Sequence, residues 1–277
     1  NWITQVYESD GTLFGLLLQF KNRHRKDLKQ FNTGHYPLDR GTANYMVALL
    51  DSYELTGNTH LLDKVAHIIR HTVSPDDDID GERDLTNVEE CWFYTVFFQA
   101  LCRYLTVQQC VAENSDFIYA KACLLHYANW MADNEYPYLE KPDILEYPNQ
   151  TWSAQDLRKV HVLAVAATYA EPDQANRFKQ KGKSLKEYIV TALSDSKERE
   201  YTRILALVMQ NYGVDTVLAS SSSSQVKQTM ASTPVTKDQH VAGWQAELLR
   251  VIKQFSPQYE WQQLQKRIPK LRRNRWH

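Results

Sequence analysis

The segment Glu146–Lys159 places acidic, basic, amide, hydroxyl and aromatic side chains at the entry of one predicted helix. Residues 160–167 behind it are almost all small or apolar, so the helix is expected to be buried. A buried helix with a polar and aromatic entry is a typical place for a binding or catalytic site. Asp156 is the candidate proton donor or acceptor in this segment. The candidate ligand contacts are Tyr147, Trp152, Gln155, Arg158 and Lys159.

Part of this segment also has a structural interpretation. Ser153 and Asp156 have the spacing of a capping box, in which two side chains close the start of a helix. Trp152 either stacks on a sugar ring or packs onto the helix that follows it. Arg158 and Lys159 lie where the helix dipole disfavours cations, so we expect acids or an anionic ligand beside them.

A second group of candidates lies at residues 34–41, before another predicted buried helix. His35 and Tyr36 have the chemistry of proton-transfer groups, and Asp39 is a candidate catalytic carboxylate. Arg40 can bind a carboxylate or phosphate through its planar guanidinium fork. The structural alternative is a loop in which Asp39 is a helix N-cap and Arg40 pairs with a neighbouring acid.

Asp76, Asp78 and Asp80 precede Gly81 in an alternating pattern that matches the opening of a calcium-binding loop. Alternate carboxylates around a glycine turn can converge on a hard cation, so calcium is the one cofactor that the sequence suggests. The glutamate that closes an EF-hand is missing, because Asn87 occupies its position. The remaining alternatives are a looser calcium site and a solvated acidic loop.

The spacing of apolar residues predicts an all-α protein built as an array of antiparallel helical hairpins. Inner helices, apolar almost all round, are expected to begin near residues 40, 88, 154 and 200. Amphipathic outer helices are expected at residues 61–72, 117–132 and 175–193. Gly57 ends the first inner helix, where it can adopt the left-handed cap conformation.

Alternate helix starts lie at the same end of an up–down hairpin array. This arrangement is expected to bring residues 34–41, 76–90 and 147–159 to one face, with Tyr94 near the start of the second inner helix. Shared placement is the strongest functional inference from the residues alone, because one face then collects the candidate acids, bases and aromatic rings.

The chain is predicted to comprise a helical-hairpin domain at residues 1–215, a Ser-rich linker at 216–240, and a C-terminal helix with a basic tail at 241–277. A net charge of -1 argues against a nucleic-acid-binding protein, and no apolar run is long enough to span a bilayer. The basic tail is either a solvated end or a contact for an anionic partner. A start at Asn1 suggests a mature or excised part of a longer protein.

Residues 48–64 resemble the helical hairpin of (α/α)-toroid carbohydrate-active enzymes. In that superfamily an inner helix typically ends in Tyr-x-x-Thr-Gly, as residues 53–57 do here, and a small polar turn and an outer helix follow. The resemblance implies an (α/α) toroid, or a partial toroid, because the predicted inner helices are fewer than a closed ring generally has. Glycosidases, polysaccharide lyases, epimerases and non-catalytic helical repeats share this turn.

The resemblance implies a sugar-binding cleft at the shared face, and the cations there favour an acidic, uronate-containing polysaccharide or oligosaccharide. In cleavage by β-elimination, one of three cations would neutralise the uronate carboxylate: Arg40, Arg158 or Lys159. The proton transfers would fall to His35 or to one of three tyrosines: Tyr36, Tyr94 or Tyr147.

In hydrolysis, a pair of carboxylates would act as acid and base, with Asp39 or Glu89 paired to Asp156. The sequence leaves elimination and hydrolysis both open. The alternative class is a non-catalytic helical scaffold, or a glycan-binding or interaction module, whose polar loop residues serve as caps and ion pairs. A carbohydrate-active protein of this kind is expected outside the cytoplasm.

Overall fold

The computed structural model describes residues 36–197 and 201–214, together with residues 13, 218, 252–253 and 255–267. The chain forms two compact units, one comprising Leu38–Lys237 and the other comprising Asn1–Pro37 with Asp238–His277. The sequence places a boundary at the Ser-rich segment, and the structure additionally groups the first residues of the chain with its last ones. The sequence alone shows no signal for that second grouping.

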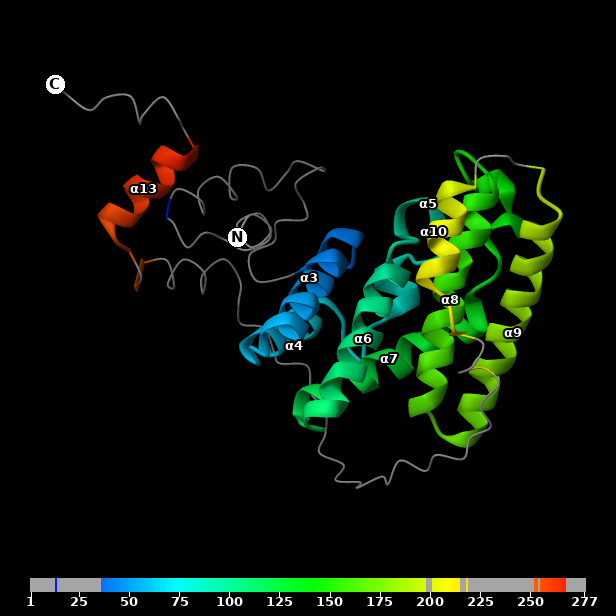
Figure 1. Cartoon of the computed structure of the whole chain (residues 1–277), viewed down its shortest axis with the longest axis horizontal. Coiled ribbons are helices and arrows are strands. Elements are labelled where there is room, and N and C mark those ends of the chain that lie inside the picture. The colour runs from blue at the N-terminus through cyan, green and yellow to red at the C-terminus, as the bar shows by residue number, and fades with distance from the viewer. Residues whose placement is uncertain are drawn as a thin grey trace. The chain divides into compact units, whose positions relative to one another are not determined.

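Within the Leu38–Lys237 unit, the described residues form helices and connecting turns, with no β-strand among them. The α-helices are α3 (Arg40–Thr56), α4 (His60–Thr72), α5 (Val88–Cys91), α6 (Tyr94–Val111), α7 (Ser115–Asn134), α8 (Gln150–Tyr169), α9 (Pro172–Ser194) and α10 (Thr202–Gln210) (Figure 1). Short helical turns lie at Ile79–Arg83, Tyr138–Glu140 and Pro142–Ile144. The all-α prediction is therefore confirmed for the described part of the chain.

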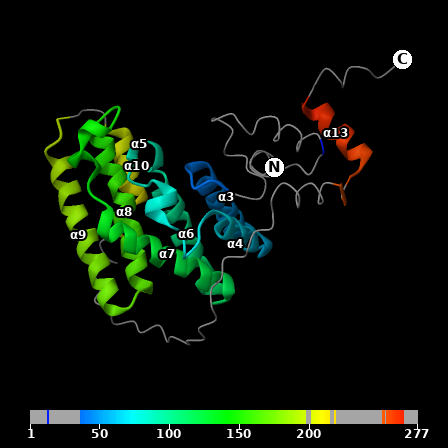
Figure 2. The same ribbon diagram turned by 180° about the vertical axis from the view of Figure 1, so that it is seen from behind.

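The long helices of this unit form two layers. Helices α3, α6, α8 and α10 contact one another in that order and make an inner layer. Helices α4, α7 and α9 likewise contact one another in order and make an outer layer. Each of the first three inner helices also contacts the outer helix that follows it in the chain, as Figure 2 shows for the α8–α9 pair. These contacts define an array of antiparallel hairpins, while closure into a toroid remains an expectation from the sequence.

Local signals set the ends of the first hairpin. The Asp39 carboxylate accepts a hydrogen bond of 2.7 Å from the Thr42 N–H, so Asp39 is the N-cap of α3. Gly57 ends that helix with φ +68°, and its N–H donates to the Tyr53 carbonyl at 2.7 Å. A glycine adopts this left-handed conformation without a Cβ penalty, which explains the tight turn into α4. Both predicted roles are confirmed.

Burial distinguishes α8 from α9 as the apolar pattern predicts, but α10, which was expected to be a buried inner helix, buries only Ile204 and Leu207. Helix α9 buries a single stripe with helical spacing: Ala175, Phe178, Gly182, Leu185 and Ile189. Helix α8 is buried on several sides, including polar positions such as Gln155, Asp156 and Lys159. Because an inner helix is covered by both its neighbours and its outer partner, any charge on its buried faces needs a partner within the protein.

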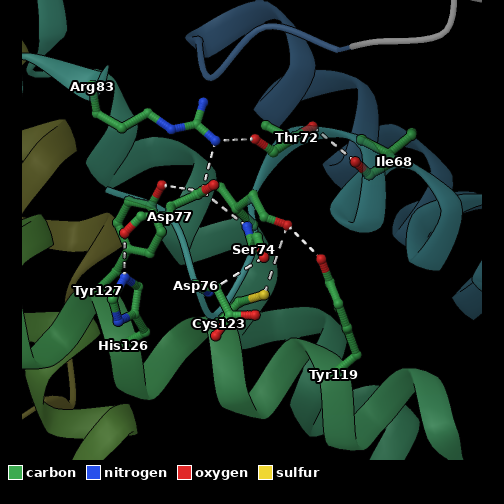
Figure 3. A network of polar contacts seen from close by, with 11 residues as sticks. Ile68, Thr72, Ser74, Asp76, Asp77, Arg83, Tyr119, Cys123, His126 and Tyr127 are labelled. Atoms are coloured by element: carbon green, nitrogen blue, oxygen red, sulfur yellow. Dashed lines mark hydrogen bonds and ion pairs between the residues drawn. The ribbon is translucent and has the colours of Figure 1, made fainter. Parts of the chain in front are cut away.

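The connection from α4 to α6 is fixed to the outer helix α7 by one buried carboxylate (Figure 3). Asp77 Oδ2 accepts hydrogen bonds from the Ser74 N–H at 2.9 Å, from Tyr127 Oη at 2.7 Å and from Arg83 Nη2 at 2.6 Å. The Asp77 carbonyl also contacts the His126 ring at 2.8 Å. Residues from the loop and from α7 therefore converge on Asp77.

Electrostatics at Asp77 favour the ionised carboxylate. Burial alone would raise the pKa of Asp77, but the hydrogen bonds from Ser74 and Tyr127 and the charge of Arg83 hold that pKa below its ordinary value. Arg83 in turn donates to the Thr72 carbonyl at the end of α4, at 2.9 Å. The ion pair between Asp77 and Arg83 thus connects the loop to α4 through Arg83 and to α7 through Asp77. These contacts explain why the acidic loop has a defined conformation.

The described residues of the second unit include helix α13 (Pro257–Arg267). Proline at the first helical position needs no hydrogen-bond partner for its nitrogen, and the Glu260 N–H donates to the Ser256 carbonyl at 2.9 Å. This helix lies within residues 241–277, for which the sequence predicts a C-terminal helix with a basic tail. Most of residues 241–255 and most of the Ser-rich linker at 216–240 lie outside the described residues.

We predict that Tyr127→Phe lowers the free energy of unfolding by about 1.5–3 kcal/mol, because it removes a donor to a buried ionised carboxylate. Urea denaturation followed by circular dichroism measures this change. Tyr212 is 91% exposed, so Tyr212→Phe is the matched control and should shift stability by less than about 0.5 kcal/mol. Equal stabilities for the two variants would contradict the role of Asp77 as the point where the loop is fixed.

Candidate functional site

The second and third polar segments of the sequence meet in the structure. The Glu146 N–H donates to Glu89 Oε2 at 3.3 Å, which joins the two loops directly. The rings of Trp92 and Trp152 pack edge to face with centroids 6.1 Å apart. Both tryptophans pack against one buried apolar cluster: Val88, Tyr138 and Leu145. The starts of α6 and α8 therefore lie at the same end of the array.

Helix α8 begins at Gln150, one turn earlier than the capping box predicts. Asn149 is the N-cap, and its side-chain oxygen accepts from the Thr151 N–H at 2.9 Å. Ser153 and Asp156 therefore lie inside the helix and are fully buried. The Ser153 hydroxyl has no hydrogen-bond partner in the described part of the chain. The capping-box prediction is wrong, because Asn149 supplies an earlier cap of a strongly favoured residue type.

Lys159 is fully buried at the centre of a charged cluster, the buried triad, made of Glu135, Asp156 and Lys159. Lys159 Nζ lies 2.7 Å from Glu135 Oε2 and 2.7 Å from Asp156 Oδ1. It also donates to the Tyr136 carbonyl at 2.6 Å and lies 3.2 Å from the centroid of the Tyr138 ring. These contacts occupy the ammonium group, so the structure gives Lys159 a structural role in place of the predicted ligand contact.

The two acids of the buried triad hold the connection between α7 and α8. The Tyr94 hydroxyl donates to Glu135 Oε1, and the Tyr138 N–H donates to Asp156 Oδ2 at 3.0 Å. Burial, and then the nearby carboxylates, raise the pKa of Tyr94 and of Tyr138 well above the ordinary value. Tyr94 is therefore a neutral, buried donor, and the structure places it out of reach of a ligand in solution.

Asp156 carries an unfavourable charge in this environment. Burial raises its pKa from 3.8 to about 6, although Lys159 and the Tyr138 N–H both act to lower it. Two ionised carboxylates around one ammonium leave a net negative charge in the interior, which is costly. Asp156 is thus a structural acid whose side chain is fully buried.

Two aromatic candidates lie at the start of α8 in different environments. Trp152 packs in the apolar cluster, and its indole N–H donates to the Tyr147 carbonyl at 3.1 Å. Tyr147 itself is 71% exposed, so its ring is available for contact with a ligand. The structure therefore favours the packing role for Trp152 and leaves Tyr147 as the accessible aromatic residue.

Arg158, unlike Lys159, is bound by neutral groups. Its Nε donates to Gln155 Oε1 at 2.8 Å, its Nη1 donates to Gln99 Oε1, and its Nη2 donates to Gln210 Oε1 at 3.2 Å. These amides come from α8, α6 and α10. No carboxylate pairs with Arg158 within the described ranges, so its charge is oriented but not neutralised.

The charges of two further arginines act on Arg158. The pKa of Arg158 is lowered below its ordinary value, first by burial and then by the charges of Arg40 and Arg203. Arg40 is the first residue of α3, and Arg203 lies in the first turn of α10; both are exposed. Neither has an acidic partner among the residues that the structure describes. We name Arg40, Arg158 and Arg203 the arginine cluster.

The remaining candidates of the first loop are divided. His35 lies outside the described residues, and Tyr36 belongs to the other compact unit, where it is half-buried. Asp39 is buried and its carboxylate caps α3, as the structural alternative predicted. Of the described residues of this loop, Arg40 has an electrostatic effect on another candidate, because its charge lowers the pKa of Arg158.

The aspartates assigned to calcium have other contacts. Asp78 Oδ1 accepts from the Gly81 N–H at 2.9 Å, and Asp80 Oδ1 accepts from Trp130 Nε1 at 2.6 Å. Asp76 is exposed. Across the described ranges, no group of three or more His, Cys, Asp or Glu side chains is arranged to hold a metal ion. The carboxylates of Asp78 and Asp80 thus serve a local turn and the contact with α7, respectively.

Sequence reasoning missed several residues that build this site. Glu135 lies outside the predicted loops, in the connection after α7, and only the fold brings it to Lys159. The amides that bind Arg158, from Gln99 and Gln210, are each more than 50 positions away along the chain. Unpaired polar residues on the otherwise apolar inner helices were the available signal for the two glutamines, because such residues need partners.

Fold and site together define an all-α array of helical hairpins with a buried triad and an arginine cluster near the start of α8. Comparisons with protein-family models, curated proteins and solved structures find no match to this chain. In the part of the chain that the structure describes, no helix combines the length and apolar character needed to cross a membrane.

We predict that Lys159→Met lowers the free energy of unfolding by about 3–5 kcal/mol, because it leaves two buried carboxylates without their cation. Chemical denaturation at neutral pH measures this loss. Lys183→Met on the exposed side of α9 is the control and should change stability by less than about 0.5 kcal/mol. A loss for Lys159→Met as small as that of the control would contradict the triad.

A second prediction concerns pH. The folded state holds the Asp156 proton more tightly than the unfolded state does, so ionising Asp156 costs folded-state stability as pH rises from about 4 to about 6. Asp156→Asn removes this contribution. Relative to the wild type, the variant should therefore gain up to about 3 kcal/mol between pH 4 and pH 7. Denaturation curves across this range measure the free energy of unfolding of the variant relative to the wild type. If that difference does not change with pH, ionisation of Asp156 is not the source of the pH dependence.

Proposed function

We propose that the Leu38–Lys237 unit binds an acidic glycan, of the uronate-containing class, by capturing a carboxylate at the arginine cluster. The observation that carries this proposal is the environment of Arg158. Its guanidinium is oriented by three glutamine oxygens from three helices and is paired with no carboxylate within the described residues. An oriented, partly buried and unneutralised arginine is well suited to bidentate binding of a carboxylate.

The charge around Arg158 supports an anionic ligand over a neutral one. The charges of Arg40 and Arg203 both lower the pKa of Arg158, so their repulsion of Arg158 disfavours the unliganded state. An anion placed among the three arginines would convert that repulsion into attraction. The sugar part of the proposal derives from the resemblance of residues 48–64 to toroid enzymes and from the exposed ring of Tyr147.

Binding is favoured over chemistry, because three of the predicted acids and bases have structural partners. Asp39 caps α3, Asp156 faces Lys159, and Tyr94 binds Glu135. Elimination or hydrolysis would need a proton donor or acceptor within reach of the ligand. Among the described candidates, none of these three buried groups meets that requirement, so we propose a glycan-binding module rather than a lyase or glycosidase.

We predict that Arg158→Gln weakens the binding of a galacturonate oligomer by about 10- to 100-fold, because it removes a charge-assisted bidentate contact. Isothermal titration calorimetry measures the affinity at low salt. The methyl ester of the same oligomer lacks the charges and should bind at least as weakly to the wild type as the acid binds to the variant. Arg40→Gln, an exposed substitution, should give a smaller loss in the same direction.

Lys183→Gln removes one positive charge from the outer helix α9 and is the matched control for Arg158→Gln. It should leave the affinity for the oligomer unchanged, because the proposed binding depends on the arginine cluster and not on the net charge of the protein. Equal binding of the acid and its ester, or equal losses for both variants, would overturn the proposal. Ultraviolet absorbance from a new conjugated double bond during the titration would show elimination, and so would overturn the assignment as a binding module.

A further inference from the structure

The outer side of α4 carries two histidines that lie one helical turn apart, His67 and His71, which we name the histidine pair. Residues with this spacing are neighbours on one side of a helix. Neither histidine belongs to the buried side of α4; His67 is exposed and His71 is half-buried. The centroids of the two imidazole rings are 3.8 Å apart. Two imidazoles with this spacing on one helix can bind a single metal ion together.

A hydrogen bond within the pair determines which nitrogen of His71 carries the proton. His71 Nδ1 lies 2.7 Å from the His67 carbonyl oxygen. A carbonyl only accepts hydrogen bonds, so Nδ1 is the donor, and in the neutral ring Nε2 then carries the lone pair. Histidines that bind metals in proteins typically donate from one ring nitrogen to a carbonyl or carboxylate and bind the metal through the other. His71 already has this arrangement.

The charged side chains near the pair on α4 are compatible with a bound cation. Arg70 Nη2 lies 2.8 Å from Asp116 Oδ1 of α7, so its charge is paired. Lys64 Nζ lies 5.9 Å from the centroid of the Tyr45 ring, toward α3. Asp63 lies one turn before the pair and is exposed, and its negative charge favours a cation on this side of the helix.

The ligand type indicates which class of ion the pair would bind. Imidazole nitrogen favours late first-row divalent ions such as zinc, nickel and copper, whereas magnesium and calcium prefer oxygen ligands. Zinc–nitrogen bonds are about 2.0–2.1 Å long, so the two rings would turn from each other toward a shared ion. Among the described residues, no third His, Cys, Asp or Glu side chain is arranged to complete the site. Water or an external ligand would therefore fill the remaining coordination positions.

We propose that His67 and His71 chelate a divalent transition-metal ion of the zinc class on the outer side of α4. This inference goes beyond the proposed function and does not depend on it, because it uses neither the arginine cluster nor a glycan. An ion held by two side chains one turn apart connects those turns of the helix. Since the ion binds the folded helix, it should also stabilise α4 against local opening.

Isothermal titration calorimetry of the full chain with zinc chloride, without a polyhistidine tag, tests the site. His67→Gln and His71→Gln should each weaken the tightest zinc binding by at least about 10- to 100-fold, because each removes a direct ligand. His60→Gln is the matched control, since His60 lies on the same helix with its side chain 89% exposed, and it should leave the affinity unchanged. Equal zinc affinity for the wild type and both pair variants, or equal binding of magnesium chloride, would overturn the proposal.

Hydrogen–deuterium exchange shows whether the ion is bound on α4. With saturating zinc, backbone amides of His60–Thr72 should exchange about threefold more slowly or slower still, while amides of α9 should not change. His67→Gln removes an exposed side chain, so it should preserve the fold and abolish this protection. Zinc binding that leaves α4 exchange unchanged, or that protects α4 equally in His67→Gln, would place the ion elsewhere and overturn the proposal.

Discussion

The ion pair between Lys159 and its two carboxylates is the interaction on which the start of α8 depends. Glu135 and Asp156 come from the end of α7 and from α8 itself, and Lys159 also binds the Tyr136 carbonyl. The connection between these helices contains two short helical turns, and the triad fixes the start of the first one to α8, because Asp156 accepts from the Tyr138 N–H. Because Trp152 packs on Tyr138 in this connection, the apolar cluster below the polar loops depends on the same charges.

Neighbouring positions on α8 have opposite roles because successive helical residues face different directions. Lys159 points into the protein, where a compact ammonium can be surrounded by carboxylates and a carbonyl. Arg158 points toward α6 and α10, where amide oxygens from Gln99 and Gln210 match its planar group. Two adjacent residues of α8 therefore carry different kinds of cation. The charge of Lys159 is neutralised by carboxylates, whereas the charge of Arg158 is only oriented by amides. Exchanging arginine and lysine between these positions would satisfy neither environment.

The sequence predicted helices, layers and local caps well, because each depends on neighbours within one or two turns. The alternation of inner and outer helices, the Asp39 cap and the Gly57 turn are of this kind. The capping box at Ser153 failed, since Asn149 offered a competing cap that pattern matching did not weigh. The partners of Lys159 and Arg158 could not be predicted, because contacts between distant segments depend on how the hairpins stack.

The same long-range contacts decide which predicted chemistry is plausible. A carboxylate needs exposure and a suitable pKa to transfer protons, and burial of Asp156 beside Lys159 removes the first condition. Amide oxygens can orient a guanidinium and leave its charge in place. A carboxylate partner would orient the guanidinium and also cancel its charge. The glutamines around Arg158 therefore preserve a positive charge in a defined direction. In the proposed function, a site built in this way would bind an anion with its shape already set before the anion arrives.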